Sequence, residues 1–187
     1  SIMGGHLCLS NHPSDTAVAL AALDARVHVA SPRGEQMLAI TDFLPGHTWV
    51  GSRLQSHVLR ADELVTGIEI PFQPTHSAYV KFAQRKSWDF AIASVAVSAV
   101  IQGRIWNDVR IVLGGVATFP YRSREAEGLL RNRSISDSAA AEAAEAALQS
   151  AKPLKMNSYK VDLSKTLVRR ALLSLAGLNK RQTSGTI

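Results

Sequence analysis

The stretch SIMGGHLCLSNHPSD, Ser1 to Asp15, decides most of what this sequence predicts, because a glycine pair precedes an acidic helix start within it. Gly4 and Gly5 lack a Cβ, so the backbone there can adopt φ > 0 and approach a ligand closely. Pro13 suits the first turn of a helix, and the amides beyond it can bind an anion such as a phosphate or be capped by a side chain. Two interpretations stay open: a phosphate-binding loop, or an ordinary tight turn before a capped helix.

The composition narrows the class of protein. Of the 187 residues, 46% are hydrophobic and 19% are charged, which is the balance of an ordinary globular protein. The longest nearly apolar run, Phe90 to Ile101, is too short to cross a bilayer, so we expect no membrane partner. Cys8 is the single cysteine, which excludes an internal disulfide and a cysteine-ligated cluster made by this chain alone.

The net charge of +6 raises the question of nucleic acid. The basic residues are scattered in small groups, such as Arg122 with Arg124 and Lys180 with Arg181, and no aromatic residues are interleaved with them. Dispersed charge of this kind rarely follows a phosphate backbone. We therefore expect a solvated or partner-facing surface and no nucleic-acid partner.

The hydrophobic pattern predicts an α+β fold. Ser14 or Asp15 can cap a helix that runs to about Leu23, because the alanines and leucines between are strong helix formers. Alternating residues and turn signals predict strands at 26–30, 35–40, 65–70, 78–83, 93–101 and 105–113. Helices are expected at 125–130, at 138–150 with Asp137 as the cap, and at 158–176. Strands followed by helices indicate an antiparallel sheet with packed helices.

Four metal-binding side chains lie within ten residues, at His6, Cys8, His12 and Asp15. No Cys-x-x-Cys or His-Glu-x-x-His spacing accompanies them, and Asp15 is better explained as a helix cap. Nothing in the sequence identifies a general base beside Cys8, so a nucleophilic cysteine is not indicated. We expect neither a metal site nor a catalytic residue in this chain.

Further motifs follow the glycine pair in a fixed order. They are His12-Pro13-Ser14-Asp15, Leu20-Ala21-Ala22-Leu23-Asp24-Ala25, Asp42-Phe43, Glu63-Leu64-Val65, Ile68-Glu69-Ile70-Pro71, Tyr79-Val80-Lys81, Phe90-Ala91-Ile92-Ala93-Ser94, Leu113-Gly114-Gly115-Val116-Ala117, Arg122-Ser123-Arg124-Glu125-Ala126-Glu127 and Tyr159-Lys160-Val161. In this order the chain resembles the FAD-binding (medium) subunit of the xanthine dehydrogenase and carbon monoxide dehydrogenase family of molybdenum hydroxylases. Within that family it most resembles the flavin subunit of the periplasmic aldehyde oxidoreductase type.

The resemblance implies a set of cofactor-binding residues in the first part of the chain. Gly4 and Gly5 would approach the FAD pyrophosphate, and Ser14 and Asp15 would contact the ribose and the adenine side. His6 stands where many relatives carry Asn or Ser, next to the same phosphates.

Three more residues are implied farther along. Leu64 and Val65 would pack against the flavin ring region, and Lys81 would reach the cofactor from the first strand of the C-terminal domain. An ammonium near a flavin stabilises its anionic reduced form, and an apolar wall excludes water from it. From the residues alone, Lys81 is equally a solvated strand residue, and plain core is the more common role for residues such as Leu64 and Val65.

The resemblance also implies domains. Residues 1–72 would be the second part of a FAD-binding domain, 77–178 a C-terminal domain like that of the CO dehydrogenase flavoprotein, and 179–187 a disordered tail. Relatives carry an N-terminal subdomain with a first glycine-rich loop, and the aldehyde oxidoreductase type adds a [4Fe-4S] insert. Neither is in this sequence, so we expect a fragment with half of the cofactor cradle.

The expected function is that of an electron-transfer subunit. It would pass electrons from iron–sulfur clusters to an acceptor through FAD, while molybdopterin and the clusters lie on a large and a small partner subunit. Cytoplasm is the default compartment, and export to the periplasm as part of a complex stays open. The alternative is a non-enzymatic α+β interaction module that has lost flavin binding.

Overall fold

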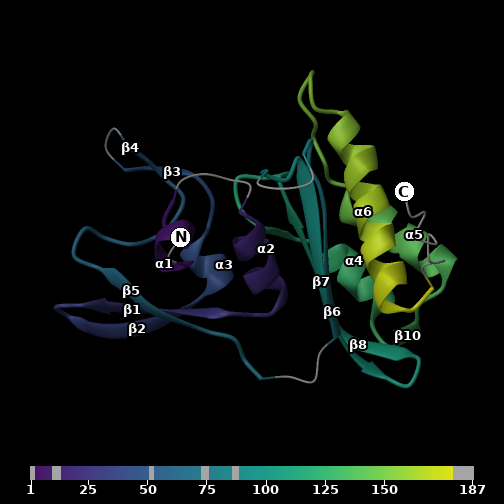
Figure 1. Ribbon diagram of the computed structural model, residues 1–187, viewed down its shortest axis with the longest axis horizontal. Coiled ribbons are helices and arrows are strands. Elements are labelled where there is room, and N and C mark those ends of the chain that lie inside the picture. Colours follow the sequence, from purple (N-terminus) through teal and green to yellow (C-terminus); the bar gives the residue numbers. More distant parts are fainter. Residues whose placement is uncertain (1–2, 10–13, 51–52, 73–75, 86–88, 179–187) are drawn as a thin grey trace, which may run out of the picture.

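The computed structural model describes residues 3–9, 14–50, 53–72, 76–85 and 89–178 (Figure 1). The helices and strands in these ranges are α1 (Met3–Leu7), α2 (Asp15–Ala22), β1 (Arg26–Ser31), β2 (Gly34–Ala39), α3 (Ile40–Phe43), β3 (Thr48–Val50), β4 (Arg53–Gln55), β5 (Leu64–Glu69), β6 (His76–Phe82), β7 (Ala93–Gln102), β8 (Ile105–Gly114), β9 (Tyr121–Arg122), α4 (Arg124–Leu130), β10 (Arg133–Ser134), α5 (Asp137–Ala147) and α6 (Tyr159–Leu175). Helices and antiparallel strands are both present, so the α+β prediction is confirmed.

The larger sheet is the central layer of the molecule. Its strands run in the order β10-β8-β7-β6, every pair is antiparallel, and β9 also pairs with β8. Helices α4, α5 and α6 cover one face, and α2 lies on the other (Figure 1). Strand β7 is therefore buried on both sides: Val95 and Val97 belong to the core under α4–α6, and Ala96 belongs to the core under α2.

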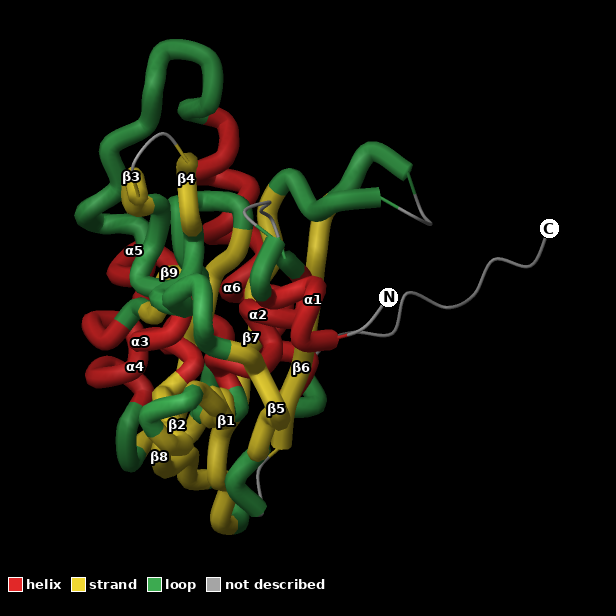
Figure 2. The backbone as a smooth tube through the Cα atoms, turned by 90° about the vertical axis from the view of Figure 1, so that its left-hand side faces the viewer, coloured by secondary structure: helices red, strands yellow, loops and turns green. Residues whose placement is uncertain are grey.

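The smaller sheet lies beyond α2, with the strand order β2-β1-β5. Seen from that side, β1, β2 and β5 lie in front, with the β3–β4 hairpin above them (Figure 2). The core beneath them contains Val27, Val29 and Phe43 together with Ala96 and Val112 of the larger sheet. Because the two sheets share this core, α2 joins the first part of the chain to the second. The domain boundaries expected from the resemblance stay a prediction.

Serine caps explain where three helices begin. The hydroxyl oxygens of Ser14, Ser123 and Ser136 accept hydrogen bonds from the third backbone amide beyond each of them. The helix α2 was expected from this pattern and is confirmed. The cap of α5 was predicted to be Asp137 and is instead Ser136, because the serine hydroxyl reaches the amide of Ala139 while Asp137 lies in the first turn.

The glycine pair differs most from expectation. Gly4 and Gly5 lie inside the short helix α1, and neither is among the described residues with positive φ, so the interpretation of the pair as an ordinary tight turn is wrong. The predicted boundary at 73–77 and the predicted tail at 179–187 fall largely or wholly outside the described residues. In the ranges that the structure describes, no helix combines the length and the apolar character needed to cross a membrane.

Candidate functional site

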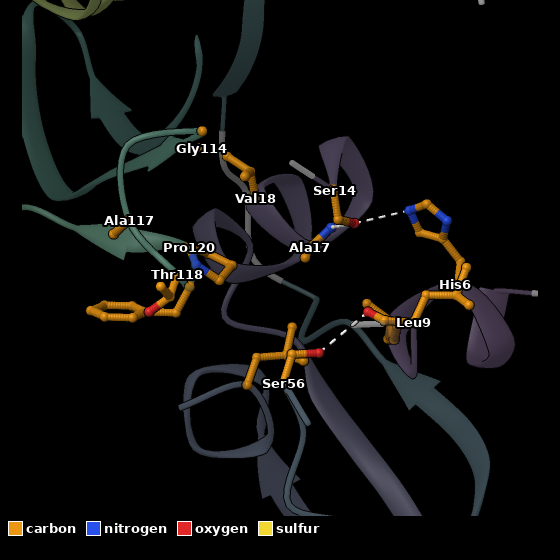
Figure 3. A pocket seen from close by; sticks show the side chains of 14 residues that line it. His6, Leu9, Ser14, Ala17, Val18, Ser56, Gly114, Ala117, Thr118 and Pro120 are labelled. Atoms are coloured by element: carbon orange, nitrogen blue, oxygen red, sulfur yellow. Dashed lines mark hydrogen bonds between the residues drawn. The ribbon is translucent and has the colours of Figure 1, made fainter. Parts of the chain in front are cut away.

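The two halves of the opening motif meet at the start of α2. The His6 Nε2 atom lies 2.9 Å from the Ser14 hydroxyl oxygen, and the same oxygen caps α2 by accepting the Ala17 amide at 3.1 Å. Figure 3 shows His6 reaching from α1 toward Ser14. The intervening residues 10–13, including His12, are outside the described ranges. The structure therefore brings the glycine-bearing helix against the acidic helix start.

The next residue of α2 connects this corner to the larger sheet. Asp15 Oδ2 accepts a hydrogen bond of 2.6 Å from the ammonium group of Lys81, which lies on β6. The same ammonium group also donates to the Asp89 carbonyl at 3.1 Å. The second carboxylate oxygen, Asp15 Oδ1, is buried and has no hydrogen bond within the described part of the chain. A buried oxygen of this kind is costly unless a donor reaches it, so the corner is suited to a ligand that carries a hydroxyl or amide donor.

Tyr79 and Ser94 lie beside this carboxylate. Burial raises the pKa of the Tyr79 hydroxyl, the adjacent Ser94 hydroxyl lowers it, and the nearby Asp15 raises it further. Ser94 is 1% exposed, and its hydroxyl oxygen forms no hydrogen bond among the described residues. Neither residue was named as a site residue from the sequence. The alternation of β6 is the signal that could have found Tyr79, because it shares a face with Lys81.

A second glycine pair, Gly114 and Gly115, lies at the end of β8 and forms one wall of a groove. A Cβ at Gly114 would lie 2.4 Å from Ser94 Oγ and 2.5 Å from Val18 Cγ2, so only glycine lets β8 lie this close to α2. Gly115 has φ +75°, and a Cβ there would lie 2.6 Å from the Ile92 carbonyl oxygen. Lys160 of α6 donates to the Gly115 carbonyl at 3.0 Å and fixes the turn from the other side of the sheet.

A small open groove, with a cavity volume of about 40 Å³, lies between these walls. It is lined by His6, Leu7, Leu9, Ser14, Ala17, Val18, Leu44, Ser56, Gly114, Gly115, Ala117, Thr118, Phe119 and Pro120. Figure 3 shows His6 and Ser14 on one side and the loop that carries Thr118 and Pro120 on the other. Of the predicted site residues, only His6 and Ser14 line it, while Asp15 and Lys81 lie beside it at the start of α2.

The segment after β4 holds the end of α1. Ser56 donates to the Leu9 carbonyl at 3.3 Å, and the Leu59 amide donates to His57 Nδ1 at 3.2 Å. Because Nδ1 accepts this hydrogen bond, the proton of the neutral His57 ring lies on Nε2. Burial lowers the pKa of His57, and the backbone of Cys8 opposes that shift. The ring also stacks on Phe43, with centroids 6.1 Å apart. A neutral histidine thus positions the glycine-bearing helix.

The far end of α2 is tied to the same sheet. The buried Ser98 hydroxyl of β7 donates to the Ala22 carbonyl at the end of the helix. Arg110 of β8 is 7% exposed and lies 3.6 Å from Asp24 and 3.0 Å from Asp108. With Lys81 at its start and Ser98 at its end, α2 is bound to the larger sheet at both ends, which fixes Asp15 relative to the sheet.

The remaining predicted residues are not gathered in one place. A Cβ on Gly4 would contact Val65 Cγ1 at 3.6 Å, whereas nothing lies within 4 Å of one on Gly5. Val65 packs against the core near α1, while Leu64 is 69% exposed. Because neighbouring residues of a strand point to opposite faces, Leu64 and Val65 cannot both line the same surface of β5.

The described residues thus include an open backbone at Gly5 and an unpaired carboxylate oxygen beside a cation. Residues 78–175 match the family described as the CO dehydrogenase flavoprotein C-terminal domain, and residues 2–73 match the FAD binding domain in molybdopterin dehydrogenase. The chain belongs to this family of FAD-binding subunits of molybdopterin-dependent oxidoreductases, and FAD is its cofactor.

Named relatives support the assignment. The nicotine 6-hydroxylase medium subunit of Paenarthrobacter nicotinovorans is 31% identical over 175 residues, which is 91% of this chain and 59% of that protein. The aldehyde oxidoreductase FAD-binding subunit PaoB of Escherichia coli is 31% identical over 170 residues, 88% of this chain and 49% of that protein. The chain thus spans about half to three fifths of these curated relatives.

Two solved structures share this fold. The quinoline 2-oxidoreductase of Pseudomonas putida 86 superposes with a TM-score of 0.80 at 28% identity, over 94% of this chain and 60% of that one. A carbon monoxide dehydrogenase from Hydrogenophaga pseudoflava superposes with a TM-score of 0.75 at 25% identity, over 88% of this chain and 60% of that one.

The residues of the corner fit FAD. The sugar hydroxyls of a dinucleotide are donors, and a carboxylate near a glycine-bearing segment is the acceptor that such hydroxyls commonly meet. Asp15 Oδ1 is an acceptor of this kind without a partner in the described residues, and the space beside Gly5 allows a ligand to approach the backbone.

Proposed function

We propose that this chain supplies one side of the FAD site in a multi-subunit molybdenum hydroxylase and takes part in electron transfer through that cofactor. The single observation that carries the proposal is the buried, unpaired oxygen of Asp15 at a corner where α1, α2 and β6 meet. The neighbouring helices α1 and α2 meet there with β6, whose Lys81 lies 66 positions beyond Asp15 in the sequence.

Each expected residue has a part in this proposal. Asp15 accepts a sugar hydroxyl, and Ser14 and His6 hold the helix start and α1 together through their 2.9 Å contact. Gly4 and Gly5 let the pyrophosphate approach the backbone, with Gly5 the more open of the two.

The other expected residues lie on the two sheets. Lys81 supplies a positive charge beside Asp15, and it keeps the carboxylate in place through its 2.6 Å contact. Val65 supports α1 from beneath, and the exposed Leu64 offers an apolar surface on the opposite face of β5. When bound, FAD supplies a ring that accepts and donates electrons.

The partners follow from the same proposal. Several relatives are named as medium chains or medium subunits, which places them in assemblies of more than one chain. We infer that the whole protein assembles with a large molybdopterin-binding subunit and a small iron–sulfur subunit. The substrate would then be oxidised on the large subunit and would not touch this chain.

The proposal is tested with the full-length protein in its assembled complex. FAD content is measured from flavin absorption after gel filtration, for the parent and for Asp15→Ala. We expect the parent to retain FAD and Asp15→Ala to lose most of it, with a melting temperature that falls by much less. Full flavin occupancy in Asp15→Ala would overturn the role of Asp15, and a parent complex without flavin would favour the alternative, an interaction module that has lost FAD.

A further inference from the structure

The connection between α5 and α6, residues 148–158, carries two strongly exposed apolar side chains. Leu154 is 74% exposed and Met156 is 84% exposed, and of the described large apolar residues only Phe72 is more exposed. Figures 1 and 2 show this connection, which we call the α5–α6 loop, projecting past the end of the larger sheet. Single exposed apolar residues are common on protein surfaces, whereas two of them together on one projecting loop indicate an interaction site.

The tip of the α5–α6 loop is held in one shape by a reciprocal pair of hydrogen bonds. The Leu154 amide donates to Asn157 Oδ1 at 2.6 Å, and the Asn157 amide donates back to the Leu154 carbonyl at 3.1 Å. The two apolar side chains are therefore presented on an ordered turn. Little backbone freedom remains to be lost when a partner binds, which favours binding.

The two ends of the α5–α6 loop are braced against the larger sheet. At its start, the Ser150 hydroxyl lies 3.3 Å from the Tyr121 hydroxyl on β9. Just beyond its end, Lys160 donates to the Gly115 carbonyl at 3.0 Å. The loop thus projects from a fixed base.

The charge on this part of the chain has one sign. Residues 146–161 contain three lysines and no acidic residue. Lys152 and Lys155 are exposed on either side of Leu154, and neither forms an ion pair within the described ranges. The preceding acidic residue, Glu145, is already paired with Lys165 at 2.6 Å. A surface that complements the loop is therefore apolar at its centre and acidic at its rim.

A protein surface fits these features better than a nucleic acid or a membrane. Nucleic-acid bases stack on aromatic rings, which Leu154 and Met156 lack. Lipid surfaces are commonly bound by the broad apolar face of an amphipathic helix, whereas residues 148–158 form no helix. Methionine is enriched in protein interfaces. Several relatives are named as medium chains or medium subunits, which places them in assemblies of more than one chain.

We propose that the α5–α6 loop docks into another subunit of the same complex, in an apolar pocket whose rim carries Asp and Glu side chains. Leu154 and Met156 fill the pocket, and Lys152 and Lys155 pair with the rim. The apolar contacts supply most of the affinity, because exposed ion pairs are screened by water and salt. The lysines attract the partner and fix its orientation. The inference rests on the proposed function, since it requires that the protein works in a multi-subunit assembly.

The test uses the full-length protein produced together with the other subunits of its complex. The purified complex is diluted in steps, and the assembled fraction is measured by mass photometry, which gives a dissociation constant. One variant combines Leu154→Ser with Met156→Ser, and a second combines Lys152→Glu with Lys155→Glu. FAD content and melting temperature are measured for each.

Two matched controls replace exposed residues elsewhere on the surface. Met37→Ser changes a methionine of β2 that is 46% exposed. Arg104→Glu reverses an exposed positive charge in the turn between β7 and β8.

We expect the Leu154 and Met156 variant to weaken assembly at least about tenfold, because both side chains lose the burial that they gain in the pocket. The charge-reversed variant should assemble about tenfold more weakly at low salt and as well as the parent at about 1 M salt, where the Debye length is about 3 Å. Both controls should assemble like the parent. FAD content and melting temperature should stay the same throughout, because every replaced side chain is exposed.

Three outcomes would overturn the inference. If both loop variants assemble like the parent and FAD is retained, the inference is wrong and the proposed function stands. If the parent chain purifies without any partner subunit, the multi-subunit part of the proposed function fails, and the inference fails with it. The third outcome is binding of the parent chain to vesicles of phosphatidylserine and phosphatidylcholine that both loop variants lose while assembly is unchanged, which would assign the loop to a membrane.

Discussion

Replacing Gly114 by alanine tests the closest approach in the molecule. The added Cβ would lie 2.4 Å from Ser94 Oγ and 2.5 Å from Val18 Cγ2, and both of those atoms belong to well-packed side chains of β7 and α2. Both side chains are at most 2% exposed, so the packing around them resists a change of rotamer. Overpacking of this kind costs about 1–3 kcal/mol, which corresponds to a fall of roughly 2–12 °C in the melting temperature of a chain of this size.

The assay is thermal unfolding followed by circular dichroism, with Gly128→Ala as the control. A Cβ on Gly128, in the middle of α4, meets nothing within 4 Å, so this variant should gain about 0.5–1 kcal/mol from higher helix propensity. Adding Val18→Ala to Gly114→Ala should cost less than the sum of the two single changes, because it removes one of the clashing atoms. Equal melting temperatures for Gly114→Ala and the parent would refute the reasoning.

Two further predictions concern the elements that hold the site. The pKa of His57 is lower in the folded protein than in the unfolded chain. As the pH falls below about 6.5, the unfolded chain therefore binds a proton before the folded protein does. The free energy of unfolding then falls by at most about 1.4 kcal/mol for each unit of pH. His57→Gln should flatten the pH dependence of urea unfolding between about pH 5 and 7, and an unchanged slope would contradict the assignment. Ser98→Ala removes the buried donor to the Ala22 carbonyl and should cost about 1–3 kcal/mol in the same assay. Ser164→Ala, whose buried hydroxyl has no hydrogen bond in the described residues, should cost close to nothing, and equal losses for the two serines would count against the Ser98 bond.

Much of the fold was predictable because local signals agree with the tertiary structure. Ser14 before an alanine-rich run predicts α2. Gly103 between two apolar runs predicts the turn of the β7–β8 hairpin, and in the structure its φ is +65°. The short helix α1 was not predictable, since two glycines in five residues oppose helix formation. The helix is held by contacts from outside it, Ser14 on His6 and Val65 beside Gly4, and spacing along the sequence does not reveal these.

The site was predictable only in part, and for a different reason. The pairing of Asp15 with Lys81 joins residues 66 positions apart, so only the family resemblance suggested that both serve one site. Strand alternation placed Tyr79 with Lys81, but the lack of a partner for Ser94 depends on how closely β8 approaches α2. The Leu113-Gly114-Gly115 motif was visible in the sequence, yet its position opposite Ser14 across the groove follows from the packing of both sheets on α2.

The most direct measurement of the central claim is a structure of the full-length protein with FAD bound, at a resolution that shows hydrogen-bond partners. The account predicts that a hydroxyl of the cofactor donates a hydrogen bond to Asp15 Oδ1 while Lys81 stays bound to Oδ2. It also predicts that the pyrophosphate of FAD lies against the protein backbone at Gly5. A structure in which FAD lies elsewhere, with Asp15 Oδ1 bound only by protein groups, would contradict it.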